Sequence, residues 1–166
     1  MAVQTVREVM TANPQCCTPA ETALAVSRKM AAGNYGAVPV VEPQTHHLVG
    51  IITDRDITCR MVAGGMDPTR VPVREGMSQD IASLGPEASI HDCVRLMEER
   101  QVRRIPIVDD RGTVLGIVAQ ADIARAAAHQ HELEGEMAKM VEQVSAPQHM
   151  LIVGNTGCRT TTGETK

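Results

Sequence analysis

The order of apolar and polar positions predicts a chain of mixed helices and strands. Residues 38–41 and 48–52 are short runs rich in Val and Ile, separated by a polar loop, and predict two buried strands. Residues 105–108 and 113–118 predict a second pair of strands. The segment Asp109, Asp110, Arg111 and Gly112 between them has the composition of a hairpin turn.

Helix signals flank each strand pair. Thr18, Pro19 and Glu21 form the pattern of a capping box with proline at the first helical position, and the helix that follows is expected to stop at Gly33. Each half is therefore predicted to be a β-α-β-β-α unit, and the fold class to be α+β. The other predicted elements are strands over residues 15–18 and 81–84, a helix from Thr53 to Gly64 and Gly65, a helix over residues 86–100 and a helix from Gln120.

The two halves are copies of one unit. Residues 6–10 recur as residues 73–77, an offset of 67, and after the loss of one loop residue Gly50 and Ile51 map onto Gly116 and Ile117. Two copies are too few for a solenoid, so we expect them to pack on each other as a closed pair.

These motifs resemble the CBS (cystathionine β-synthase) domain in its tandem form, the Bateman module. The resemblance rests on the stretch from Gly50 to Ile57 and on residues 104–109, and it covers residues 5–130. It implies a small stand-alone bacterial CBS protein with domains at 5–65 and 72–130, packed as a pseudo-two-fold pair. Beyond them, an apolar stripe predicts a helix over 131–147, and Gly and Thr predict a flexible tail over 148–166; the stripe consists of Leu133, Met137, Met140, Val141 and Val144.

The resemblance also implies a function. Such pairs bind an adenosyl ligand (AMP, ADP, ATP or S-adenosylmethionine) between their two sheets and regulate another protein, in some cases as energy sensors. No resident cofactor is expected. The expected partners are the adenine nucleotide, an unidentified regulated protein and a second copy of the chain, joined through the CBS helices as a homodimer. The alternative is a scaffold or interaction protein with empty clefts, which nucleotide titration would distinguish.

By this resemblance, acidic residues clamp the ribose. Asp56 would accept hydrogen bonds from both ribose hydroxyls, and Thr53 would bond the ribose or a phosphate. The alternative is that both residues only cap the helix that begins there. In the second copy Asp122 is retained, but Ala119 replaces the hydroxyl residue. The first cleft is therefore expected to bind more tightly, and Asp56→Ala to cost more affinity than Asp122→Ala.

Phosphate and adenine contacts are also implied by the resemblance. Arg55, Arg103 and Arg104 are candidates for the phosphates because a guanidinium matches phosphate oxygens, with solvated surface arginines as the alternative. The candidates for the adenine slot would lie in the core in any case: Cys16, Val38 and Pro39 in one copy, and Ile81, Ile105 and Pro106 in the other. Tyr35 would either cover the first cleft or lie half-buried in a loop.

Composition argues against several other functions. The chain has 166 residues with one Tyr and no Phe or Trp, which removes the aromatic platforms on which single-stranded nucleic acids stack. A net charge of −4 also argues against a nucleic-acid partner. No apolar run approaches the roughly 18 residues of a membrane helix. We therefore expect a soluble, cytoplasmic protein that does not bind membranes.

Metal and enzyme motifs are not recognisable. The five cysteines are odd in number and include no C-x-x-C pair, so reduced thiols are expected. Cys16, Cys17, His46 and His47 could be drawn together around zinc, but their spacing matches no structural zinc pattern, and no metal site is predicted. The chain contains no G-x-x-x-x-G-K-[ST], G-x-S-x-G or H-E-x-x-H, so it is not expected to be an enzyme.

Overall fold

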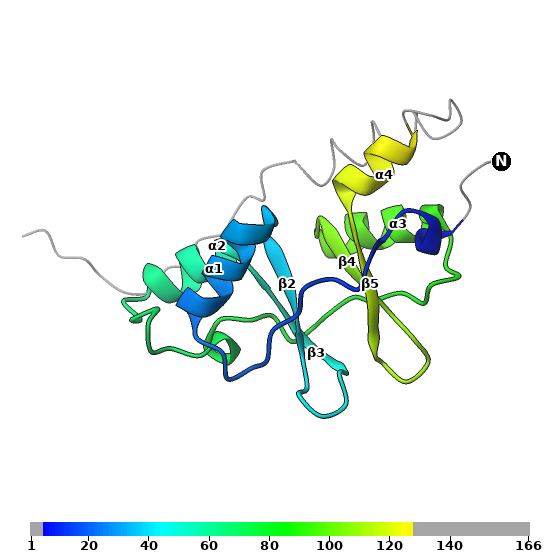
Figure 1. The fold of residues 1–166 in the computed structure, drawn as a ribbon. Helices are drawn as coiled ribbons and strands as arrows, with labels where there is room; N and C mark the ends of the chain where they lie inside the picture. Colours follow the sequence, from blue (N-terminus) through cyan, green and yellow to red (C-terminus); the bar gives the residue numbers. More distant parts are fainter. Residues whose placement is uncertain (1–4, 128–166) are drawn as a thin grey trace, which may run out of the picture.

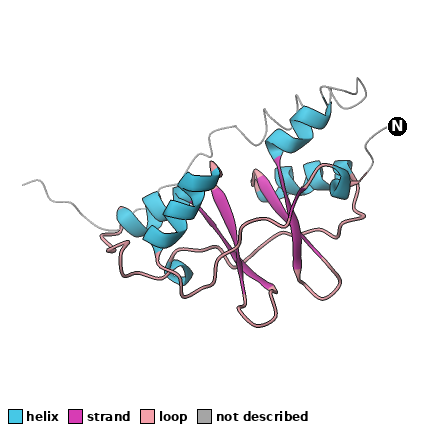
Figure 2. Ribbon diagram, viewed as in Figure 1, coloured by secondary structure: helices cyan, strands magenta, loops and turns pink. Residues whose placement is uncertain are grey.

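The computed structural model describes residues 5–127, which form two similar units side by side (Figure 1). The first unit contains η1 (Val6–Glu8), β1 (Thr11–Ala12), α1 (Ala23–Gly33), β2 (Ala37–Val41), β3 (Leu48–Thr53), α2 (Asp54–Asp56) and η2 (Ile57–Val62). The second contains η3 (Val73–Glu75), α3 (Ile90–Arg100), β4 (Arg104–Val108), β5 (Val114–Ala119) and α4 (Gln120–Ala127). Figure 2 shows the helices toward one end of the two strand pairs and the hairpin loops at the other.

The strand pairs confirm the α+β prediction. β2 pairs antiparallel with β3, and β4 pairs antiparallel with β5 in an equivalent register. The predicted turn between β4 and β5 is present, because the Gly112 N–H donates to the Asp109 carbonyl at 2.9 Å. Gly112 has a φ of 84°, a conformation that glycine adopts without steric cost.

The predicted starts of α1 and α3 are wrong by several residues. α1 begins after Thr22, whose side chain accepts a hydrogen bond from the Ala25 N–H, and α3 begins after Ser89, which accepts from the Asp92 N–H. The Thr18 N–H does donate to the Glu21 carboxylate at 2.8 Å, but in a turn that precedes the helix. The helix cannot extend back to Pro19 because residues 19–22 pair with residues 71–74 instead. Tertiary pairing thus outweighs the local helix signal.

The short strands predicted over residues 15–18 and 81–84 are reduced to single bridges. Cys17 bridges to β2, and Leu84 bridges to β4 at the equivalent place in the second unit. Extended pairing occurs earlier in the chain, where β1 pairs antiparallel with β5 of the other unit. The strand predictions therefore place the extended segment a few residues too late.

The two units exchange their N-terminal segments. We call residues 5–15 the first lead-in and residues 72–82 the second lead-in. The Val6 N–H donates to the carbonyl of Ala88 at 2.9 Å, and the Val73 N–H donates to that of Glu21 at 2.8 Å. Each lead-in thus crosses to the opposite unit. In Figure 1 the dark blue η1 accordingly lies beside α3.

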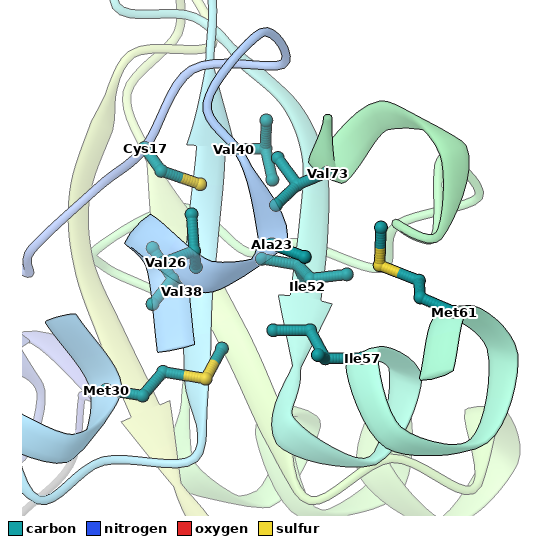
Figure 3. Packing of buried hydrophobic residues seen from close by; sticks show 10 residues of the cluster. All are labelled: Cys17, Ala23, Val26, Met30, Val38, Val40, Ile52, Ile57, Met61 and Val73. Atoms are coloured by element: carbon teal, nitrogen blue, oxygen red, sulfur yellow. The ribbon is translucent and has the colours of Figure 1, made fainter. Parts of the chain in front are cut away.

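This exchange completes both hydrophobic cores. Val6, fully buried, packs in the core of the second unit, and Val73, also fully buried, packs in the core of the first. Figure 3 shows Val73 among side chains from α1, β2 and β3. The isolated bridges between the units also obey the repeat, since Thr22 pairs with Pro72 as Thr5 pairs with Ser89. The pair is therefore pseudo-two-fold symmetric.

The helices after β3 and β5 differ between the units. α2 continues as the π-helix η2, in which the Ala63 N–H donates to the Thr58 carbonyl at 3.0 Å, whereas α4 is an ordinary α-helix. Single turns of π-helix are frequent at functional sites.

Two expectations concern residues beyond this structure. The helix predicted over 131–147 and the tail predicted over 148–166 both lie outside the described residues. Among residues 5–127, no helix combines the length and apolarity that crossing a bilayer requires. The cytoplasmic location remains a prediction.

Candidate functional site

A cavity of about 430 Å³ opens between the two units. The first unit contributes the end of its lead-in, including Pro14, and the segment 33–37 that joins α1 to β2. The second unit contributes Arg104, the end of β5 and the first turn of α4 with Asp122 and Arg125. We refer to this space as the Asp122 cleft.

Asp122 is held in place at the wall of this cleft. One carboxylate oxygen, Oδ2, accepts from the Ala119 N–H at 2.7 Å, and the other, Oδ1, accepts from the Arg125 guanidinium. The Asp122 side chain is 11% exposed, whereas that of Arg125 is 74% exposed. Both carboxylate oxygens are thus engaged, which fixes the orientation of the carboxylate at the cleft wall.

The equivalent carboxylate of the first unit is more fully occupied. Asp56 Oδ2 accepts from both the N–H and the hydroxyl of Thr53, at 3.0 and 2.7 Å, and the Thr53 hydroxyl accepts from the Asp56 N–H. The predicted cap at Thr53 is therefore confirmed. Arg60 lies 3.3 Å from Asp56 Oδ1 and also donates to the Gly76 carbonyl and the Ser78 hydroxyl. This guanidinium ties Asp56 to the second lead-in.

The three arginine candidates occupy different environments. Arg104, half-buried, lines the Asp122 cleft and forms no ion pair with any residue in the described range 5–127. Arg103 and Arg55 are exposed and do not line that cleft. The structure therefore brings Asp122 and Arg104 together, but not Asp56, Thr53, Arg55 or Arg103. The expected order of the two clefts remains a prediction for binding measurements.

The adenine candidates lie mainly in the hydrophobic cores. Val38 and Ile105 are fully buried, Pro39 and Pro106 are buried beside them, and Cys16 and Ile81 are half-buried. None of the six lines the Asp122 cleft, whose apolar surface comes from other residues, among them Pro14, Ala37 and Ile117. Their assignment to adenine remains a prediction.

A second cavity, of about 380 Å³, lies beside the helices of the first unit. It is lined by α1, the start of α2 and η2, and by Asn34, Tyr35 and Gly36, which also line the Asp122 cleft. The segment 34–36 therefore separates the two cavities. Half-buried Tyr35 packs its ring against Gly33, where a Cβ atom would lie 1.8 Å from the ring.

The cysteines do not form a metal site in the described part of the chain. Burial raises the pKa of the Cys17 and Cys93 thiols to about 12, so both are protonated at neutral pH. The Cys16 thiol is half-buried and donates to the Pro14 carbonyl at 3.3 Å. Within residues 5–127, no cluster of three or more His, Cys, Asp or Glu side chains could hold a metal ion.

Three features of the site were missed by sequence reasoning. Arg125 follows Asp122 by three residues and Arg60 follows Asp56 by four, spacings at which helical side chains meet, so both ion pairs had a sequence signal. The contribution of the first lead-in to the Asp122 cleft had none, because it depends on the exchange between units.

Comparison with protein families identifies both units. The model of the CBS domain matches residues 6–62 and 71–129. CBS domain-containing protein YhcV of Bacillus subtilis is 40% identical over 122 residues, which cover 74% of this chain and 84% of YhcV. Hypoxic response protein 1 of Mycobacterium tuberculosis is 34% identical over 143 residues, covering 86% of this chain and 95% of that protein.

Solved structures agree with the fold. The crystal structure of Hypoxic Response Protein I with two coordinated zinc ions is 36% identical, covers 73% of this chain and 97% of its own, and has a TM-score of 0.67. The CBS domain pair of protein MJ0100, in complex with 5′-methylthioadenosine and S-adenosyl-L-methionine, is 22% identical with a TM-score of 0.70 and covers 77% and 98% of the two chains.

Proposed function

Because this chain belongs to the CBS domain family and carries two copies of the domain, we propose that it is a regulatory module that binds an adenosyl ligand in the Asp122 cleft and reports it to a partner protein. Its candidate ligands are AMP, ADP, ATP and S-adenosylmethionine. This role requires binding and no catalysis.

The observation that carries the proposal is the pairing of Asp122 and Arg104 on one cavity. The carboxylate accepts hydrogen bonds only, which suits the two hydroxyls of a ribose. The guanidinium is a half-buried cation without an ion-pair partner in the described residues, which suits a phosphate. The cavity, about 430 Å³, falls within the roughly 300–1,000 Å³ typical of small-molecule sites.

The apolar surface of the cleft suits a purine ring. Pro14 and Ala37 come from the first unit and Ile117 from β5 of the second, so the ring would lie between the units. The complex of the MJ0100 pair with two adenosyl compounds supports the same ligand class for this fold. In this arrangement a ligand contacts both units at once and can change how they pack.

Calorimetric titration of the wild-type protein tests the proposal. We expect AMP to bind more tightly than adenosine, which lacks the phosphate that Arg104 would contact, with GMP as the control for base recognition. Parallel titrations with ATP and S-adenosylmethionine would rank the other candidates. Absence of binding by all the adenosyl compounds would contradict the proposal and favour the scaffold function.

The protein is also expected to form a homodimer. Val62, at the end of η2, is 50% exposed, and Met66, four residues later, is 38% exposed; most large apolar side chains among residues 5–127 are more buried than these. A second copy packed over this surface would remove them from water, in keeping with the dimer expected through the CBS helices. Light scattering should give about twice the chain mass of 17.8 kDa at micromolar concentration. A mass near that of one chain would contradict this expectation.

A further inference from the structure

A carboxylate of the first unit approaches the free arginine of the second unit beside Gly36. A Cβ atom at Gly36 would lie 2.8 Å from Asp54 Oδ2 and 3.3 Å from Arg104 Nη2. The Asp54 carboxylate and the Arg104 guanidinium therefore both lie against the Cα of Gly36. A side chain at position 36 would occupy the space that brings them near each other. Figure 1 shows the starts of β2 and β4, next to these residues, at the same end of the two hairpins.

Asp54 is oriented toward this point. Its Oδ1 accepts from the Arg55 N–H at 2.7 Å, and its own N–H donates to the Gly36 carbonyl at 3.1 Å. Oδ2 is the oxygen nearest Gly36. The carboxylate lines the second cavity, which shares segment 34–36 with the Asp122 cleft.

The second unit has no such charge. Its equivalent residue is Gln120, whose N–H donates to the Arg103 carbonyl at 2.9 Å just as that of Asp54 donates to Gly36. The backbone arrangement is therefore the same in both units, and only the first unit places a negative charge there. Asp54 therefore places a negative charge near Arg104, and this charge would repel a phosphate bound to that arginine.

We propose that Asp54 determines ligand specificity in the Asp122 cleft, so that the cleft selects adenosyl ligands with a single phosphate over those with two or three. This inference rests on the proposed function. Within residues 5–127 the cleft contains two arginines, and Arg125 is already paired with Asp122. Arg104 has no ion-pair partner in the described residues, so a single phosphate is enough to neutralise it. Each further phosphate adds negative charge that Asp54 repels.

The test is the replacement of Asp54 by a neutral side chain of the same size. In calorimetric titrations at fixed low ionic strength and without Mg²⁺, Asp54→Asn should tighten ATP binding about three- to tenfold and AMP binding less than about twofold. Asp54→Glu, which keeps the charge, should retain the wild-type preference for AMP. Asp110→Asn is the matched control, since it removes an exposed carboxylate from the β4–β5 turn at the far end of the hairpin.

The outcomes separate this inference from the proposed function. An equal shift of AMP and ATP affinity in Asp54→Asn, or no preference for AMP in the wild-type protein, overturns the specificity role while nucleotide binding stands. Failure of the wild-type protein to bind any adenine nucleotide overturns both. Thermal unfolding of each variant checks that the fold is retained, because Asp54 is the first residue of α2.

Discussion

Asp122→Ala is expected to weaken the binding of AMP by about ten- to a hundredfold. The substitution removes the carboxylate that would accept from both ribose hydroxyls, and hydrogen bonds to charged groups contribute about 1.5–3 kcal/mol. The effect should be visible because this carboxylate lies on the wall of an open cavity together with Arg104. Calorimetric titration with AMP measures it.

Asp56→Ala is the matched control for this prediction. It removes the equivalent residue, which also receives hydrogen bonds at the start of a helix, so both variants lose a similar structural contact. Because Thr53 and Arg60 already engage Asp56, we expect Asp56→Ala to change AMP affinity less than about threefold. The sequence favoured the opposite order. A large loss in Asp56→Ala with little change in Asp122→Ala would restore that order and contradict the assignment of the ligand to the Asp122 cleft.

Val73→Ala is expected to lower the free energy of unfolding by about 1.5–3 kcal/mol, because it removes two buried carbons worth about 0.8 kcal/mol each and the resulting cavity adds to the cost. Val73 is fully buried, and the truncation leaves a space that its neighbours can fill only in part. Urea denaturation followed by circular dichroism measures the change. Gln44→Ala, a truncation of an exposed side chain in the loop between β2 and β3, should change the stability by less than about 0.5 kcal/mol.

The part of the protein that Val73→Ala destabilises shows whether Val73 packs in the core of the other unit or of its own. Val73 belongs to the second unit by sequence but packs in the core of the first. Hydrogen exchange should therefore accelerate in β2 and β3 before it does so in β4 and β5. Faster exchange confined to β4 and β5 would show that Val73 supports its own unit instead.

The four core strands could be predicted from sequence because their signal is local. β-Branched residues that are buried over a short run favour extended structure wherever the run lies, and β2, β3, β4 and β5 begin and end within about a residue of their predicted bounds. The starts of α1 and α3 could not be predicted in this way. The residues before them satisfy their backbone groups with a segment about 50 residues or more away, which no local pattern reveals.

The candidate site was predictable in residue type more than in arrangement. The repeat indicated Asp56 and Asp122 as equivalent positions, and the structure places both at the starts of helices. Whether a cavity lies open beside each one depends on neighbouring side chains. The reach of Arg60 to Ser78 and the approach of Arg104 to Gly36 follow from the packing of the two units, so their consequences for the clefts could not be read from motif spacing.

The exchange of lead-ins also determines when each hydrophobic core can be completed during synthesis of the chain. A ribosome releases the residues of β2 and β3 before it releases Val73, so the first core is still missing one of its side chains when its own strands have emerged. Val6, by contrast, is synthesised well before α3, β4 and β5, and is available as soon as they appear. When synthesis has just passed Gly65, the first core therefore still lacks Val73. At the same moment Val6 has no core to pack in, because the second unit has not yet been made.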